Sequence, residues 1–404
     1  MASLALIDNV LDIVEDDYND HEEEEDEEED NVVDYYNMER IITDCVTQSD
    51  LSLVWDVMSC HSVYLSSFLR THHILLHSNT APLPMSMRHM ISIMSSARLS
   101  CSYLVTQHKQ ELVRSGVEAE SLSEFPGKIR KLYDLNMLLA HRPWQLTKQH
   151  IRELTQSGPE SWSLSELVYS IILMSHYHCL SSFIMSCVSM EPDVSGDLMM
   201  SSSDSGPGEE SYRVEELMKR MSVLRRKQDS PPAQEELQSR FNSIRVQSSS
   251  DVISRPRVES DISDYVRDVD FQYVDFAKRQ DQTATFRIQD FTWDEEGFST
   301  IARFDEDTAQ CLDDKFRTIY NLTYGTMGQH SSIDTSLFRR ASWNYIQCIW
   351  GIRHDDYDYQ EVNELLHRDL KRYIKTSSCY PDRCNKSDYE SIMKDFQDSE
   401  KVRF

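Results

Sequence analysis

Residues 321–359 combine hydroxyl groups, an arginine and an apolar helix face, a set that could bind a small zwitterion. A Thr-Tyr-Gly-Thr loop at 323–326 supplies the hydroxyl groups, and its glycine frees the backbone. Arg339 lies one turn into a helix that the apolar periodicity predicts for 334–351. A guanidinium can bind a carboxylate while apolar side chains surround the rest of a ligand. The alternative interpretation is a core helix with a polar N-terminal cap.

A second set of reactive residues consists of Cys101, Tyr103 and His108. Seven residues make two helical turns, so Cys101 and His108 would share one helix face, about 10 Å apart along the axis. A thiolate at this position could reduce a peroxide and become a sulfenic acid. His108 could lower the thiol pKa through an intermediate group. The alternative interpretation is a cysteine that only packs in the core.

Two further groups of histidines and cysteines do not favour a metal site. One is His-Tyr-His-Cys at 176–179, and the other is Cys379 with Cys384. Residues two apart on a helix point to different sides, so His176 and His178 do not chelate together easily. The sequence also has no Gly-rich phosphate loop and no His-Glu-x-x-His motif. We therefore predict neither a metal nor a cofactor.

Helices must position these residues, and helical periodicity recurs through most of the chain. The 404 residues include 6 Trp, 19 Tyr and 14 Phe but only 10 Gly and 11 Pro. This composition favours helices around sizeable cores over a sandwich or barrel, which would need many turns. We therefore predict an all-α fold. Ser163 and Glu166 would cap one helix, and Asp358 and Glu361 another. In the C-terminal part the predicted helices are 305–320, 334–351, 358–376 and 386–399.

Composition divides the chain into four predicted segments. Residues 1–37 form an acidic disordered tail, which either keeps the protein in solution or docks a basic partner. Residues 38–190 and 265–404 carry apolar residues at helical spacing and form two helical domains. Residues 191–264 are rich in Ser, Pro and charge, which predicts a disordered linker. Within it, 212–227 is periodic enough for a transient helix.

Charge and cysteine usage limit the partners and the compartment. The net charge is −28, and 14 acidic residues between positions 15 and 34 supply half of it. Such a chain lacks the basic surface that nucleic acids or anionic membranes require. Nine cysteines at irregular spacing predict reduced thiols in the cytoplasm or the nucleus. We find no apolar run of about 20 residues and no basic signal region, so we expect no membrane span.

Four stretches of this sequence resemble the sestrin family, in the order in which sestrins carry them. They are 97–108, 136–151, 161–183 and 321–359. The resemblance covers about 40–190 and 265–404. It implies two related helical halves similar to bacterial alkyl-hydroperoxidase helical domains. It also implies a stress-response regulator that restrains TOR signalling by binding the GATOR complex, with leucine as a release signal. The second implied activity is a thiol-dependent alkyl hydroperoxide reductase acting with peroxiredoxins.

The resemblance also implies roles for individual residues. Arg339 would bind the α-carboxylate of leucine and Glu400 its α-ammonium. The hydroxyl groups of the same site would come from Thr323, Tyr324, Thr326 and Thr335. The partner surface would include Ser163, Asp355 and Asp356. Without the family, Ser163 is interpreted as a helix N-cap and the two aspartates as a solvated loop pair.

The reductase site and the leucine site both depart from the patterns of the proteins they resemble. Cys101, Tyr103 and His108 match the residues proposed for hydroperoxide reduction in sestrins. Leu104 replaces the second cysteine of the alkyl hydroperoxidases, so turnover would need an external thiol.

In the leucine site, Met393 stands where the family has a tryptophan wall, and Arg403 where it has a histidine. The chain ends at Phe404, where sestrins continue with another apolar helix. We therefore expect exposed core surface and a pocket that binds methionine and isoleucine almost as well as leucine.

Overall fold

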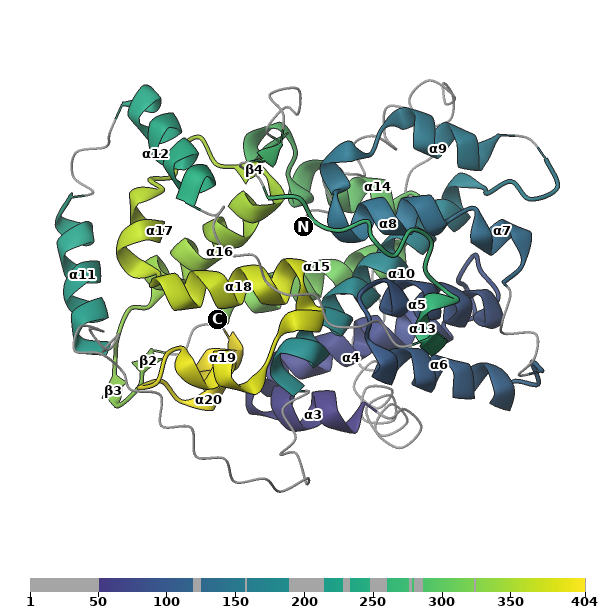
Figure 1. The fold of residues 1–404 in the computed structure, drawn as a ribbon, viewed down its shortest axis with the longest axis horizontal. Coiled ribbons are helices and arrows are strands. Elements are labelled where there is room, and N and C mark those ends of the chain that lie inside the picture. The colour runs from purple at the N-terminus through teal and green to yellow at the C-terminus, as the bar shows by residue number, and fades with distance from the viewer. Residues whose placement is uncertain are drawn as a thin grey trace, which may run out of the picture.

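The computed structural model describes nine ranges of the chain. They are 51–118, 125–156, 158–188, 214–227, 233–247, 260–275, 278–279, 286–322 and 325–403. These ranges are mostly helical (Figure 1). The strands described in them are two residues long and form two small two-stranded pairs. The prediction of an all-α fold is confirmed, whereas the predicted acidic tail, 1–37, lies outside the described residues.

The first helices surround the long helix α10. Helix α5 packs against α6 and α10. Helix α8 packs against both α5 and α10. Proline sets two boundaries, because Pro84 precedes α5 and Pro143 follows the end of α8. The bounds are α3 (Ser52–Met58), α4 (Ser62–His77), α5 (Met85–Arg98), α6 (Ser102–Arg114), α7 (Gly127–Arg130), α8 (Tyr133–His141), α9 (Lys148–Thr155) and α10 (Leu164–Phe183).

Helix α10 and the π-helical turn after it are apolar enough to resemble a membrane span. The stretch Leu164–Cys187 meets that criterion by length and composition alone, although no such stretch was expected from the sequence. In the structure 78% of its most apolar window is buried inside the protein. This degree of burial is that of the central helix of a folded core.

The predicted linker contains two helices of 14 residues each, α11 (Val214–Lys227) and α12 (Gln234–Gln247), followed by the short α13 (Ser260–Ser263). The periodicity that predicted a transient helix corresponds to α11. This helix buries apolar side chains three or four residues apart, namely Val214, Leu217, Met221 and Leu224. A docked apolar stripe explains why a polar, serine-rich region still forms a helix here.

The C-terminal helices follow the predicted positions with two exceptions. The predicted helix 358–376 is two helices, and so is 386–399. The capping box of Asp358 and Glu361 is wrong, because the buried Glu361 carboxylate pairs with Arg340 at 2.8 Å instead. The bounds are α14 (Phe298–Ala302), α15 (Glu306–Asn321), α16 (Ser336–Trp350), α17 (Gln360–Leu365), α18 (Arg368–Cys379), α19 (Lys386–Ser391) and α20 (Asp398–Arg403). Strand β1 (Phe286–Arg287) is parallel to β4 (Ile352–Arg353), and β2 (Thr326–Met327) is antiparallel to β3 (His330–Ser331).

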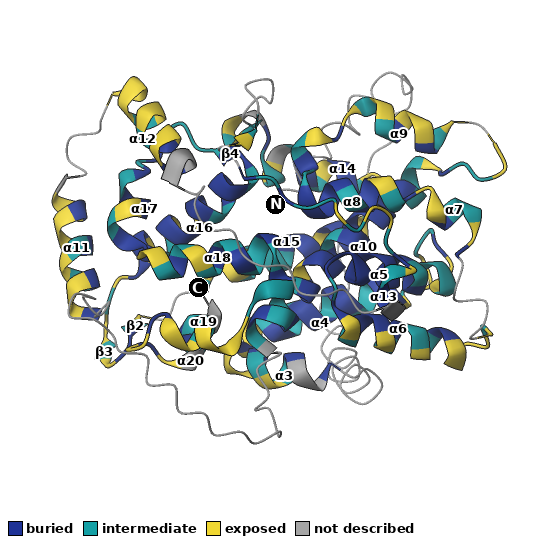
Figure 2. Cartoon of the chain, in the orientation of Figure 1, coloured by how far each residue is buried: buried dark blue, intermediate teal, exposed yellow. Residues whose placement is uncertain are grey.

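The buried side chains form two clusters. Figure 2 colours the buried residues dark blue. The first cluster contains the apolar faces of α3 to α10 together with those of α14 and α15. Helices α11, α12, α16, α17 and α18 supply most of the second. Helix α15 joins the first cluster by packing against α4, where Arg70 pairs with Asp314 at 3.2 Å. The change from the first buried cluster to the second therefore falls between α15 and α16. The division of the chain into four segments remains a prediction.

Candidate functional site

The N-terminus of α16 holds the predicted carboxylate-binding arginine. Thr335 is its buried N-cap residue, but the capping hydrogen bond comes from Asp334, whose Oδ1 accepts from the backbone N–H of Ser336 at 2.9 Å. One turn further, Arg339 Nη1 donates to the carbonyl of Leu322 at 3.3 Å. Its Nε is buried and has no hydrogen-bond partner in the described part of the chain. A ligand carboxylate would supply the acceptor that this N–H lacks.

Glu400 lies on α20, is only 3% exposed, and also holds the loop before α16. Its carboxylate accepts the N–H of Gly328 at 2.9 and 3.2 Å and that of Gln397 at 2.9 Å. Among the described residues its partners are N–H donors, and no ion pair neutralises its charge. Arg339 and Glu400 thus bind the loop at Leu322 and Gly328, the two ends of the segment that carries the predicted hydroxyl groups.

The backbone at Gly328 permits this arrangement. Its φ is +61°, and a Cβ added there would lie 2.4 Å from the carbonyl oxygen of Asp395. Of the predicted hydroxyl residues, Thr326 is half-buried on β2. Thr323 and Tyr324 lie outside the described residues.

Apolar side chains of the loop, of α16 and of the segment before α20 belong to one buried cluster. Met327 and Phe338 are fully buried, and the Phe338 ring stacks on Phe396 with centroids 6.0 Å apart. Met393, which replaces the expected aromatic wall, is buried in the same cluster with a φ of +46°. The region therefore offers an apolar wall beside one cationic and one anionic group.

The two predicted partner residues that follow β4 differ in their surroundings. Asp355 is half-buried between two arginines, with Arg353 at 2.7 Å and Arg287 at 3.4 Å. Asp356 is exposed and accepts a hydrogen bond from Gln289 at 3.2 Å. The description as a solvated loop pair fits only Asp356, since Asp355 is held by ion pairs.

Ser163 is the N-cap of α10. Its hydroxyl accepts the N–H of Glu166 at 3.2 Å, and the Glu166 carboxylate accepts the N–H of Ser163 at 2.9 Å. Lys128 pairs with the same carboxylate at 2.8 Å. These hydrogen bonds lower the pKa of Glu166, although partial burial opposes them. The capping box predicted from the sequence is confirmed, and it accounts for this serine without any partner.

We expect Ser163→Ala to lower the free energy of unfolding by about 1 kcal/mol, because the cap of a central helix is lost. Ser163→Asn should retain nearly all the stability, since asparagine caps as well. Chemical denaturation measures both changes. An unchanged stability in Ser163→Ala would contradict the capping role. Loss of a partner by the stable Ser163→Asn variant would show that the hydroxyl group also serves docking.

The sequence predicts Cys101 inside a helix. In the structure it is instead the N-cap residue of α6. Burial raises the pKa of its thiol to about 11, although hydrogen bonds from Leu104 and Ser181 act in the opposite direction. His108 is buried two turns along α6, and its Nδ1 lies 2.9 Å from Nδ1 of His89. No hydrogen bond joins Cys101 to His108 in the described structure. Tyr103, the third predicted residue of this site, is half-buried. The thiol is therefore mostly protonated at neutral pH.

Comparison with known proteins decides the family. The family model described as "PA26 p53-induced protein (sestrin)" matches residues 21–404. This chain belongs to the sestrin family. Sestrin-2 of Homo sapiens is 43% identical over 374 residues, which cover 86% of this chain and 78% of the relative. Sestrin-3 of Mus musculus is 40% identical over 405 residues, covering 90% and 82%. The sestrin homolog of Drosophila melanogaster is 37% identical over 469 residues, covering 92% and 94%.

This sestrin also contains a buried cluster of four histidines that the sequence analysis missed. His72 Nδ1 lies 3.0 Å from His176 Nε2, and the second pair is His89 with His108. Tyr177 packs edge-on against three of the four rings. The members come from α4, α5, α6 and α10, so no spacing in the sequence could reveal them. Among the described residues no group of three or more ligating side chains gathers around a metal position.

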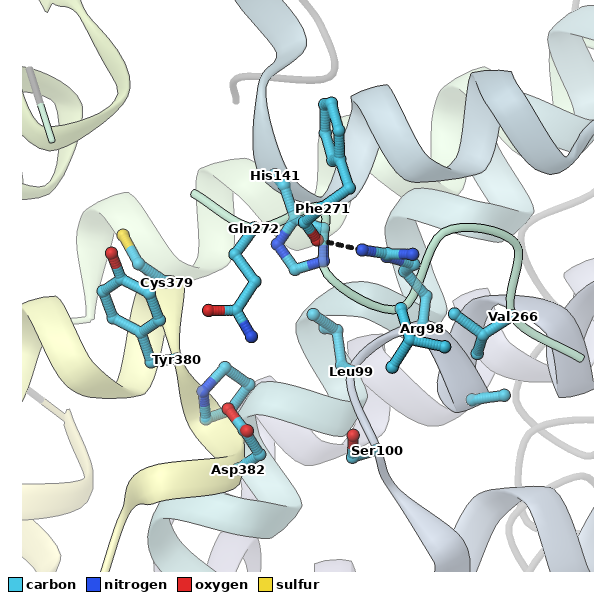
Figure 3. A pocket seen from close by; sticks show the side chains of 13 residues that line it. Arg98, Leu99, Ser100, His141, Val266, Phe271, Gln272, Cys379, Tyr380 and Asp382 are labelled. Carbon is cyan, nitrogen blue, oxygen red and sulfur yellow. Dashed lines mark hydrogen bonds between the residues drawn. The ribbon is translucent and has the colours of Figure 1, made fainter. Parts of the chain in front are cut away.

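A small pocket lies where the two clusters meet, between the end of α5, the end of α18 and the segment 266–272 (Figure 3). Its volume is about 30 Å³, and Arg98 at its edge donates to the carbonyl of Phe271. That space is large enough for a water molecule but too small for an amino acid. Neither Arg339 nor Glu400 lines this pocket, so the proposed ligand region lies elsewhere.

Proposed function

We propose that this sestrin restrains TOR signalling by binding the GATOR complex and that leucine releases it. The observation that supports a leucine site is the pair of opposite charges on one loop. Within the described ranges, the buried Nε–H of Arg339 has no acceptor and the buried Glu400 carboxylate has no cationic partner. An amino acid supplies both missing partners, since its carboxylate accepts and its ammonium donates.

Helix α16 connects the proposed leucine site with the proposed partner surface. It starts beside the loop that Arg339 and Glu400 bind, and its 15 residues span about 22 Å. Gly351 ends it in a left-handed turn with a φ of +85°, and β4 leads directly to Asp355 and Asp356. A shift of this packed helix would move both ends together, which gives ligand binding a route to the docking surface.

We expect Asp355→Ala with Asp356→Ala to abolish capture of the GATOR complex while the protein stays folded. Asp356 is exposed, whereas the Asp355 ion pairs are half-buried, so their loss costs about 1–3 kcal/mol and thermal unfolding serves as the folding control. The measurement is a pulldown with purified complex at equal protein concentration. The matched control is Asp307→Ala, which removes an exposed acid from a different element, α15. Equal capture by the double variant and the wild type would contradict the assignment.

The second candidate function is a thiol-dependent alkyl hydroperoxide reductase acting with peroxiredoxins. The observation that favours it is the place of Cys101 at the N-terminus of α6, where backbone N–H groups stabilise a thiolate. Burial outweighs this effect and raises the pKa of the thiol, which favours the regulatory function. Both functions place the protein in the cytoplasm or nucleus, where thiols stay reduced.

If the reductase activity exists, Cys101→Ser should reduce hydroperoxide consumption to the background rate. Cys101 is the N-cap residue of the helix that carries His108. The assay supplies an alkyl hydroperoxide and an external thiol, and Cys60→Ser removes an exposed thiol as the control. Persistent turnover in Cys101→Ser, or none in the wild type, would refute the enzymatic role.

A further inference from the structure

Helix α11, which comes from the predicted linker, lies against the loop of the proposed leucine site. At its start, Val214 Cγ2 is 3.3 Å from the position that a Cβ on Gly328 would occupy. Near its end, Arg225 Nη2 binds both the carbonyl and the carboxylate of Asp334, at 2.8 and 2.7 Å. The helix thus contacts the loop beside Glu400 and again beside Arg339.

Asp334 receives interactions from three directions. Its carboxylate accepts the N–H of Ser336, and this capping bond is the largest cause that lowers its pKa. The positive charges of Arg225 and Arg339 lower the pKa further, so both arginines act on the same carboxylate. Arg225 makes the direct ion pair, while the Nη1 group of Arg339 is directed at Leu322. A carboxylate released by Arg225 would become a partner for Arg339.

We propose that α11 is a clasp that keeps the leucine site competent. This inference rests on the proposed function. When α11 is docked, Arg225 occupies Asp334, and Arg339 remains available to the carboxylate of the ligand. When α11 detaches, Asp334 turns to Arg339 and the loop loses its support at Gly328. The linker therefore regulates amino-acid binding from outside the site.

The energetics suit a reversible element. The Arg225–Asp334 pair is largely exposed, so it contributes less than about 1 kcal/mol. The apolar stripe of α11, with Leu217 1% exposed, provides most of the docking free energy. By linkage, any preference of the ligand for the docked state strengthens docking by the same factor. Leucine should therefore slow amide exchange in α11 as well as in the loop.

The test combines hydrogen exchange of 325–335 and of 214–227 with calorimetric titration of leucine into the full chain. Leu217→Ala weakens the apolar stripe, and Arg225→Glu repels Asp334. Arg226→Glu is the matched control, because Arg226 is exposed on the same turn and no hydrogen bond or ion pair joins it to the described part of the loop. We expect faster loop exchange without ligand in both variants. Leucine affinity should fall about fivefold in Arg225→Glu and more in Leu217→Ala.

The outcomes separate this inference from the function on which it rests. Unchanged loop exchange in both variants overturns the clasp, whatever the wild type binds. Faster loop exchange with unchanged leucine affinity overturns its regulatory role. If the wild type binds no leucine, the proposed function fails, and the clasp then loses the site it would regulate even if the loop exchanges faster. Faster exchange with weaker leucine binding, and neither effect in Arg226→Glu, supports it.

Discussion

Arg339→Ala should weaken leucine binding by more than about 100-fold, below detection in a calorimetric titration. A buried carboxylate that loses its only cationic partner keeps its desolvation cost, which is several kcal/mol. Arg339→Lys keeps the charge but lacks the planar pair of donors, so it should bind with intermediate affinity. Arg372→Ala, which removes an exposed arginine on α18, should change nothing.

Glu400→Gln should abolish leucine binding, because it removes the negative charge that would pair with the ammonium group of leucine. The shape of the side chain beside Gly328 is kept. Thermal stability of each variant without leucine serves as the folding control. Leucine affinity unchanged in Arg339→Ala, or in Glu400→Gln, would refute the corresponding role. The predicted loss of selectivity against methionine and isoleucine is measured with the wild type in the same titrations.

The second large effect is a loss of stability in mild acid. Burial lowers the pKa of His72 to about 3 and that of His89 to about 4, and it lowers those of His108 and His176 well below their usual range. The charged groups that act on these four rings are Lys315, Arg88, His73 and His77 or other members of the cluster, and none is a carboxylate. Protonation within the cluster therefore finds no counter-charge.

The sign follows from proton binding. The unfolded chain takes up protons at these histidines near pH 6.5, whereas the folded chain does not until the pH falls to about 4 or lower. Stability is complete above pH 6.5 and is lost as the pH falls through that window. We expect the free energy of unfolding to fall by a few kcal/mol between pH 7 and 5, above the range in which most carboxylates titrate.

Urea denaturation at a series of pH values measures this slope. His89→Gln removes one group of the cluster and should flatten the slope, whereas His367→Gln, at an exposed position, should leave it unchanged. A stability that stays constant from pH 7 to 5 would contradict the account of the cluster.

Local signals explain which parts of the fold were predictable. Ser163 and Glu166 cap α10 within one turn, and Pro143 follows α8, so both boundaries depend on neighbouring residues. The start of α17 was less predictable, because Glu361 is held by Arg340 on another helix rather than by a capping box with Asp358. The histidine pairs and the docking of α11 also join residues far apart in the sequence.

The same distinction applies to the candidate site. Arg339 could be placed on its helix from periodicity, whereas its relation to Glu400 depends on a loop that α20 holds through Gly328. For Cys101, the apolar periodicity continues across the residue and therefore predicts a position inside a helix. In the structure the chain turns at Ser100, which has a φ of +63°, and α6 starts only afterwards.

The central claim is that leucine releases this sestrin from the GATOR complex through Arg339. The most direct measurement is capture of purified GATOR complex by immobilised protein over a series of leucine concentrations. The wild type should capture the complex without leucine and release it as leucine increases, while Arg339→Ala should capture it at every concentration. Wild-type capture that does not change with leucine, or release that is equal in Arg339→Ala, would contradict the claim.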